Sequence, residues 1–345
     1  MSEERLMSEE RLAVEHGPQE PPLVPQSGTT GAVVRDGIPT YYGRSQLKPA
    51  PFNNWVVGGY IFLAGLSGAS ALLATAGDLG RGRGASGLVR RGRYLSLLAP
   101  TIGSALLIWD LHTPQRFYNM LRVAKSTSPM SIGTWLLMSF AGFAGVSAAA
   151  QFGADRFGWR WMRRAARITQ VPAAVTGAGL STYTAALLSA TSTPLWAAAP
   201  QALAVRFGSS SIASGAAALS LGERPGRTRR ALDTIALAAL ATELVAATSS
   251  HRTYRQKGVA AALDGGWGQA ERLGATGAGT LLPLGLHAAS LLLGRGRAPA
   301  LSGLASFAIL AGSALLRISV MAAGDESARR PEISLRYAQP ENLPK

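Results

Sequence analysis

The chain has 345 residues, of which 47% are hydrophobic and 15% are charged, and it contains no cysteine. Soluble domains carry roughly 25% charged residues, so the composition argues against a disordered chain and against an ordinary soluble domain. The lack of cysteine excludes a disulfide scaffold, a thiol nucleophile and a Cys-ligated iron–sulfur cluster within the chain. The formal net charge of +15 raises nucleic acid as a partner, but the placement of the arginines indicates another origin.

Residues 1–50 are rich in proline and glycine and show no hydrophobic periodicity, so they have no core of their own. Their acidic start is unlike a signal peptide, which has a basic region followed by an apolar one. Tyr41, Tyr42 and Arg44 are residue types favoured as anchors at interfaces. We expect residues 1–50 to form an extended, external N-terminal arm laid on a partner subunit, with a disordered tail as the alternative.

Eight apolar runs follow, most of them near the length of about 20 residues that crosses a bilayer. They have no polar face to offer to water, which predicts an all-α, polytopic membrane protein with eight transmembrane helices, arranged as two four-helix bundles. The transmembrane domain is expected over 51–323 and an external C-terminal tail over 324–345. The runs are 55–77, 94–109, 131–154, 168–190, 194–222, 231–250, 273–293 and 298–323.

The basic residues are distributed unevenly over the segments that connect these runs. Connections after odd-numbered runs contain sixteen Arg or Lys residues, and connections after even-numbered runs contain seven. Basic residues accumulate on the cytoplasmic side of membrane proteins. The odd connections are therefore expected inside, and both termini outside, the plasma (cytoplasmic) membrane. The net positive charge then reflects the orientation of the chain in a lipid bilayer, and no nucleic acid partner is expected.

The connection at 110–130 carries side chains that a plain connector does not need. Asp110 directly follows the second apolar run, and the loop adds His112, Arg116 and two aromatic residues. An acid at the membrane interface can carry protons between water and a site within the membrane. Asp110 is therefore a candidate for proton handling; the alternative is that it pairs with Arg116 and only ends a helix.

Several motifs, taken in order, resemble those of one family. WDLHTPQRFYNML at 109–121 is followed by SPMSIGTW at 128–135, STYTAALLSATSTPLW at 181–196 and ALLRISVMAAGDESA at 314–328. Over about residues 40–330 the chain is similar to the NrfD/PsrC family, the membrane anchor subunits of polysulfide-reductase-like molybdoenzyme complexes.

The resemblance implies an integral-membrane subunit that binds quinone or quinol, either menaquinone or ubiquinone, near the external face. Such subunits pass electrons between the quinone pool and a ferredoxin-like iron–sulfur subunit, which connects to a molybdopterin catalytic subunit. The chain alone is then not catalytic. The alternatives are a membrane transporter, whose broken helices Pro172, Pro200 and Pro283 would permit, and a purely structural anchor with an inactive quinone site.

A quinone head group needs an apolar slot, hydrogen-bond donors at its carbonyl oxygens and a proton path. The candidate donors near the external face are Tyr60, His112 and Tyr183, and Asp110 is the candidate that handles protons. Family members often carry Asn and His in the opening turns of the first helix, where this chain has Val57 and Tyr60. This departure leaves the ligand set open and keeps the structural anchor as an alternative.

The histidines argue against a di-haem subunit, which usually needs four axial His within its spans. Of the four histidines, His16 lies in the tail, His112 in a loop and His251 at a helix end, and only His287 lies well inside an apolar run. We therefore expect no haem, no iron–sulfur cluster and no metal site in this chain.

Five further polar residues are candidates for supporting roles. Arg116 and Ser128 belong to the motif-bearing loop, and Arg116 is expected to hold the loop in place. Glu243 and Arg206 lie within apolar runs, where an unpaired charge is costly. They are expected to form an internal ion pair or to belong to a proton route toward the cytoplasm. Arg317 lies near the external end of the last run, where it could reach the interface.

Overall fold

The computed structural model describes residues 33–35, 38–40, 47–80, 86–111, 113–224, 226–292 and 298–342. The chain divides into two units, Met1–Gln46 and Leu47–Lys345. In the first unit β1 (Val33–Arg35) and β2 (Ile38–Thr40) pair antiparallel, with Val33 opposite Thr40. Apart from this hairpin, the part of the predicted arm up to residue 46, including Tyr41, Tyr42 and Arg44, lies outside the described residues.

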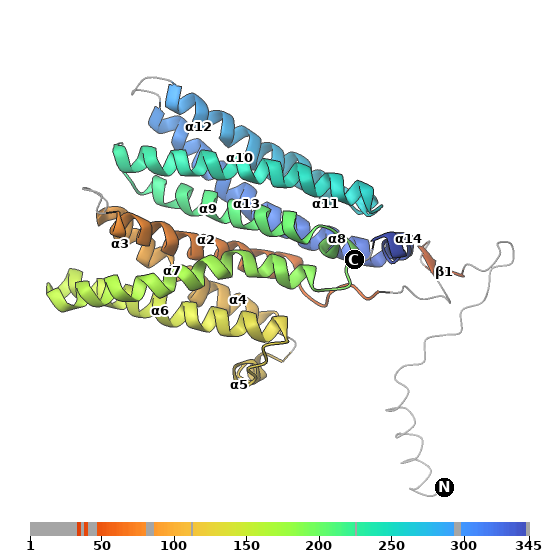
Figure 1. Ribbon diagram of the computed structural model, residues 1–345, viewed down its shortest axis with the longest axis horizontal. Helices are drawn as coiled ribbons and strands as arrows, with labels where there is room; N and C mark the ends of the chain where they lie inside the picture. The colour runs from red at the N-terminus through yellow and green to blue at the C-terminus, as the bar shows by residue number, and fades with distance from the viewer. Residues whose placement is uncertain are drawn as a thin grey trace, which may run out of the picture. The chain divides into compact units, whose positions relative to one another are not determined.

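All regular elements described in the second unit are helices (Figure 1). The long ones are α2 (Asn54–Leu79), α6 (Pro129–Phe157), α7 (Arg160–Ser189), α9 (Pro200–Leu221), α10 (Arg227–Gln256) and α13 (Ala298–Arg329). The shorter α-helices are α3 (Ser86–Leu95), α4 (Ser104–Trp109), α5 (Asn119–Arg122), α8 (Pro194–Ala198), α11 (Gly266–Gln269), α12 (Leu282–Leu292) and α14 (Pro331–Tyr337). The π-helices are η1 (Ala99–Gly103) and η4 (Ala270–Leu281), and the 3-10 helices are η2 (Pro114–Arg116), η3 (Ala260–Leu263) and η5 (Pro340–Asn342).

Five of the helices are long and apolar enough to cross a membrane: α2, α6, α7, α10 and the Ala300–Arg329 part of α13. The prediction of an all-helical protein with membrane-spanning segments is thereby confirmed. The other three apolar runs lie on α9, on the series α3–η1–α4 and on the series η4–α12. In the last two, π-helical turns interrupt the α-helix, so neither contains one long regular helix.

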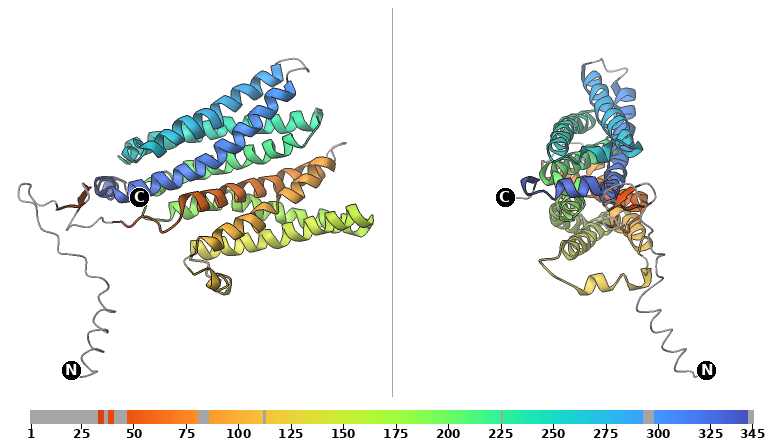
Figure 2. Two further views of the ribbon diagram at one scale, coloured as in Figure 1. Left: turned by 180° about the vertical axis from the view of Figure 1, so that it is seen from behind. Right: turned by 90° about the vertical axis from the view of Figure 1, so that its right-hand side faces the viewer.

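The long helices run side by side along a common direction (Figures 1 and 2). In one group of neighbours α2 packs against α3 and α7, and α7 packs against α6; in the other α10 packs against α9 and α12 against α13. Helix α2 also contacts α9 and α13, so it joins the two groups. The buried cluster at this junction includes Phe140, Trp196 and Phe207.

Small residues allow these helices to approach closely. A Cβ atom on Gly68 of α2 would collide with the backbone carbonyl oxygen of Gly177 in α7. One turn away the Ser181 hydroxyl donates to the Gly65 carbonyl oxygen at 3.4 Å. Gly279 of η4 and Gly312 of α13 meet in the same way. Contacts of this kind replace the hydrophobic driving force that is missing between helices in lipid.

The helix boundaries near the prolines and at the C-terminus differ from those that the eight apolar runs predict. Helix α7 continues through Pro172, whereas α8 ends at Ala198 and α9 begins at Pro200. Helix α13 extends to Arg329, beyond the last apolar run, and α14 follows it. The segment expected as a tail from residue 324 therefore begins as helix, because Ser327 and Asp325 find buried partners there.

Candidate functional site

Two carboxylates hold the segment 50–54 that leads into α2, and we call this arrangement the entry site. Asp110 Oδ1 accepts a hydrogen bond from the Asn53 backbone N–H at 3.2 Å. Asp325, at the end of α13, accepts from the Asn54 side-chain amide at 2.9 Å and from the Ala50 backbone N–H at 3.3 Å. The Asn53 side chain in turn caps α2. The entry site thus joins the start of α2 to the ends of α4 and α13.

Asp110 is half-buried and follows the last residue of α4. Arg116 is exposed in η2, and among the described residues no ion pair joins it to Asp110. The alternative in which the acid pairs with Arg116 is therefore not what this structure shows; the backbone of Asn53 is the partner instead. His112 lies outside the described residues.

An open apolar hollow of about 580 Å³ is lined by Ala105, Ile108, Trp109 and Pro114, and Asp110 follows Trp109 in the sequence. Trp109, the residue before Asp110, is 82% exposed. Tyr60 of α2 packs against Gly103, two residues before the lining residue Ala105: a Cβ atom on Gly103 would be 3.2 Å from the ring carbon Cδ2 of Tyr60. The surface of this hollow is apolar and partly aromatic.

The two tyrosines expected as donors have different surroundings. Tyr60 is buried in α2, and its hydroxyl has no hydrogen-bond partner among the described residues. The Tyr183 hydroxyl donates to the Pro129 carbonyl oxygen, and its ring lies over Gly133. The two side chains are close enough to interact electrostatically. Tyr60 is thus the free donor, and Tyr183 ties α7 to the start of α6.

The motif SPMSIGTW is explained by hydrogen bonds that fasten the preceding loop onto α6. Ser128 caps the helix by accepting from the Ser131 backbone N–H at 3.4 Å. The Ser131 hydroxyl accepts from Lys125 N–H at 2.9 Å and donates to the Val123 carbonyl oxygen at 2.7 Å. Trp135 Nε1 donates to the same carbonyl oxygen at 3.1 Å. The expected supporting role of Ser128 is local capping, and Ser131 and Trp135 were not among the expected site residues.

Arg317 is 1% exposed, which corrects the expectation of an interface charge. Because α13 extends to Arg329, residue 317 lies within the helix and not near its end. Its guanidinium donates to the hydroxyls of Ser210 at 2.8 Å and Ser211 at 3.0 Å, and to the Ser313 carbonyl oxygen at 2.8 Å. Hydroxyl and carbonyl groups of α9 and α13 therefore bind both terminal nitrogens of this buried cation, whereas its Nε has no partner among the described residues.

Arg206 pairs with Glu271 of η4, and not with Glu243 as the sequence suggested. Both side chains of this pair are buried, and the Thr276 hydroxyl lies 2.9 Å from Arg206 Nη2. Glu271 was expected in a connection, but the π-helix η4 begins one residue before it and turns it inward. Glu243 instead accepts from the Thr280 hydroxyl at 3.2 Å.

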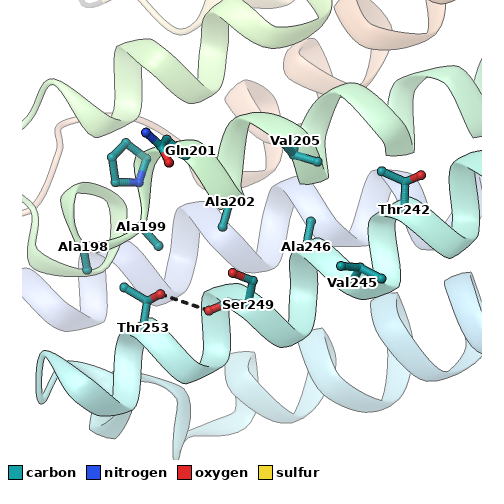
Figure 3. Close-up of a pocket in the computed structure, with 11 residues that line it drawn as sticks. Ala198, Ala199, Gln201, Ala202, Val205, Thr242, Val245, Ala246, Ser249 and Thr253 are labelled. Carbon is teal, nitrogen blue, oxygen red and sulfur yellow. Dashed lines mark hydrogen bonds between the residues drawn. The ribbon is translucent and has the colours of Figure 1, made fainter.

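A second hollow, of about 450 Å³, lies between α9 and α10 (Figure 3). Its lining is small and apolar with a few hydroxyls, and the Thr253 hydroxyl is already bonded to the Ser249 carbonyl oxygen at 3.0 Å. No ionisable side chain lines it. It therefore lacks the proton-handling group that the entry site has.

In the described part of the chain, no three His, Asp or Glu residues gather as a metal site would require.

The long apolar helices and the buried polar groups between them define an α-helical membrane protein. Residues 46–326 match the family described as polysulphide reductase NrfD, and the chain belongs to this family. None of the curated proteins compared with the chain matches it. The resemblance read from the motifs is thereby confirmed, and membership of the family indicates a membrane subunit of a molybdoenzyme complex.

Proposed function

We propose that the protein is the quinone-reactive subunit of a molybdopterin oxidoreductase and passes electrons between the quinone pool and an iron–sulfur subunit. The observation that carries this proposal is the entry site, where Asp110 bonds to the start of α2 and directly follows Trp109, which lines an open apolar hollow. Neither this hollow nor the one between α9 and α10 is lined by an ionisable side chain, but only the first includes a neighbour in sequence of Asp110.

To support quinone reduction or quinol oxidation, the chain needs mainly to bind the quinone and to handle its protons. When a quinol is oxidised it releases two electrons and two protons, and the reverse reaction takes them up. Tyr60 donates a hydrogen bond to one ring oxygen, and Asp110 accepts or supplies a proton at the other. His112 remains a proposed ligand of the ring. Tyr183 positions the surrounding segments, since its hydroxyl is bonded to Pro129, whereas Arg116 is exposed.

The proposed topology has eight crossings in two four-helix bundles, with both termini outside the plasma membrane. Support comes from the excess of basic residues in the odd connections and from three interrupted or shorter helical series that match the remaining apolar runs. In this orientation the entry site faces outward. The proposed domains are the arm 1–50, the transmembrane domain 51–323 and the external segment 324–345.

A ferredoxin-like iron–sulfur subunit would dock on the external face, close to the entry site. The chain has no cysteine and hence no cluster of its own, so the quinone must lie near the cluster of the partner. The exposed aromatic residues Phe117 and Tyr118, beside Arg116, suit an interface. The molybdopterin catalytic subunit would bind through the iron–sulfur subunit.

Cysteine labelling tests the proposed orientation on a background that has no native thiol. Ser86, the first residue of α3, and Ser126, in the loop before α6, are both exposed. In intact cells an impermeant thiol reagent should label Ser126→Cys and leave Ser86→Cys unlabelled until the membrane is opened. The opposite pattern would show that the chain is inserted the other way round.

Purification under native conditions tests the assignment to a redox complex. Tagged full-length protein from its own host should bring down partner proteins together with iron and molybdenum, and the complex should exchange electrons with added quinone. The same chain purified alone should show no haem absorption and no quinol oxidation. A chain that recovers no metal-containing partner, or haem bands in the isolated chain, would contradict the assignment and favour a transporter or another class of membrane protein.

A further inference from the structure

The turn between α6 and α7 gathers aromatic rings at the surface. Helix α6 ends at Phe157, Gly158 reverses the chain with a φ of 70°, and α7 begins at Arg160. Phe157 stacks on Trp159 with ring centroids 5.0 Å apart, and Trp159 stacks on Trp161 at 6.1 Å. All three rings are exposed. Because tryptophan is enriched where the membrane meets water, this turn should lie at the level of the lipid headgroups.

Positive charge is concentrated in the same turn and is not neutralised there. Residues 155–167 contain five arginines and a single acid, Asp155. That acid lies 2.9 Å from Arg90. Arg160 and Arg164, in the first turns of α7, are exposed, and neither forms an ion pair with another residue that the structure describes. An anion from outside the chain can therefore pair with them.

Beyond these arginines the exposed face of α7 becomes apolar. Ile168, Val171 and Val175 follow Arg164 at intervals of three or four residues, which places them on one side of the helix. Ile168 is 71% exposed and Val175 is 69% exposed. Val175 lies eleven residues beyond Arg164, which is about 17 Å along an α-helix, whereas the hydrocarbon of one leaflet is about 15 Å thick. We call Arg160 and these four residues the α7 stripe.

The charge at the beginning of the α7 stripe determines which lipid fits it. Arg160 and Arg164 stand about one helical turn apart, or about 6 Å along the axis, so both can reach one headgroup. A guanidinium group binds phosphate oxygens through two parallel N–H groups. A zwitterionic headgroup carries an ammonium group that competes for the phosphate, whereas an anionic phospholipid leaves its negative charge free for the arginines.

We propose that the α7 stripe binds one anionic phospholipid. Arg160 and Arg164 hold the phosphate, Trp159 and Trp161 lie beside the glycerol backbone, and an acyl chain follows the apolar part of the stripe. In the proposed orientation this lipid belongs to the cytoplasmic leaflet, whose anionic lipids attract basic segments. The site needs only that the chain lies in a membrane, so it is independent of quinone chemistry.

Native mass spectrometry of the full-length chain in detergent tests the site by counting the lipids that the chain retains. Phosphatidylglycerol should fill one site at concentrations at which phosphatidylcholine does not. Replacing Arg160 and Arg164 together by glutamine should weaken this binding about 30-fold, because each basic residue near an anionic surface contributes about a fivefold factor in affinity.

The matched control is the double variant Arg227→Gln and Arg230→Gln. It removes the same charge from the exposed start of α10, at the same end of the helices (Figure 1), where residues 222–234 contain no aromatic side chain. The control should keep the affinity for phosphatidylglycerol. Equal retention of the two lipids by the wild type, or equal losses in the two double variants, would overturn the proposal. Displacement of the lipid by inorganic phosphate would also overturn it, since the site would then bind phosphate without a lipid.

A second measurement locates the lipid even if the arginine variants do not fold. In nanodiscs of phosphatidylcholine, a small share of phosphatidylglycerol with brominated chains should quench tryptophan fluorescence more than the same share of brominated phosphatidylcholine. Replacing Trp159 and Trp161 by phenylalanine should remove this excess. Trp267→Phe, at an exposed ring in α11, should leave it. No excess in the wild type, or an excess that survives the loss of Trp159 and Trp161, would contradict the site.

Discussion

Replacing Asp110 by asparagine should lower quinone-linked turnover about 10²-fold, the low end of the effect of a general acid–base group. Asparagine keeps an oxygen that can accept the hydrogen bond from the Asn53 backbone N–H, so the entry site should stay intact, but the amide does not titrate. Turnover should be measured per assembled complex. Activity of the partner subunits with an artificial dye should be normal.

The matched control is Asp264→Asn, which removes an exposed carboxylate from the connection after η3. It should leave turnover unchanged, which excludes a general effect of charge loss. If Asp110 only anchors segment 50–54, the asparagine variant should keep full turnover, whereas Asp110→Ala should lower the yield of complex. Full turnover of Asp110→Asn would remove this residue from the mechanism.

The largest effect on stability is expected at the buried pair of Arg206 and Glu271. Without Arg206 the buried Glu271 keeps only His251, whose Nε2 lies 3.4 Å from Oε2, and without Glu271 the buried Arg206 loses its acid. Breaking a buried ion pair in this way costs about 3–5 kcal/mol. Arg206→Met or Glu271→Gln should therefore lower the denaturation temperature sharply in detergent. The double variant with both changes should recover much of the loss, because the two buried charges of the pair are then both removed and His251 can stay neutral.

Arg163→Met is the matched control for this experiment, since Arg163 is exposed in the first turns of α7. It should leave the denaturation temperature almost unchanged. Additive losses in the double variant would argue that Arg206 and Glu271 act independently and that their pairing does not stabilise the protein.

The apolar runs and the motifs predicted the helical membrane architecture and the family, because long stretches without a polar face have few other structures open to them. The buried pairings could not be predicted in the same way. Arg206 had an acid within a run, Glu243, as the apparent partner, but the π-helical register of η4 brings Glu271 to it instead. The hydrophobic periodicity of the sequence does not predict a π-helical register.

The candidate site was predicted in part. Asp110 lies where the sequence suggested, next to an apolar surface, but Asp325 and Asn54 were missed although they complete the entry site. The sequence did contain a signal, since Asp325 stands in the motif at 314–328 and Asn54 directly precedes the first apolar run. Contacts between residues 271 positions apart become visible only once α2 and α13 are packed together.

For Tyr183, the sequence suggested a site residue whose hydroxyl is bonded elsewhere in the structure. Its place near a helix end suggested a donor for quinone, but the hydroxyl is bonded to the Pro129 carbonyl oxygen and the ring fills the space left by Gly133. The glycine in SPMSIGTW is thereby explained as well. One hydrogen bond thus connects two family motifs and engages the hydroxyl that the sequence suggested as a quinone donor.

Photoaffinity labelling with an azidoquinone tests the central claim most directly. The isolated full-length chain in lipid nanodiscs should be labelled on peptides that contain Tyr60 or the segment 103–114, around the apolar hollow beside Asp110. An excess of unmodified quinone should displace the label. Labelling confined to the hollow between α9 and α10, or labelling that unmodified quinone does not displace, would contradict a quinone site at the start of α2.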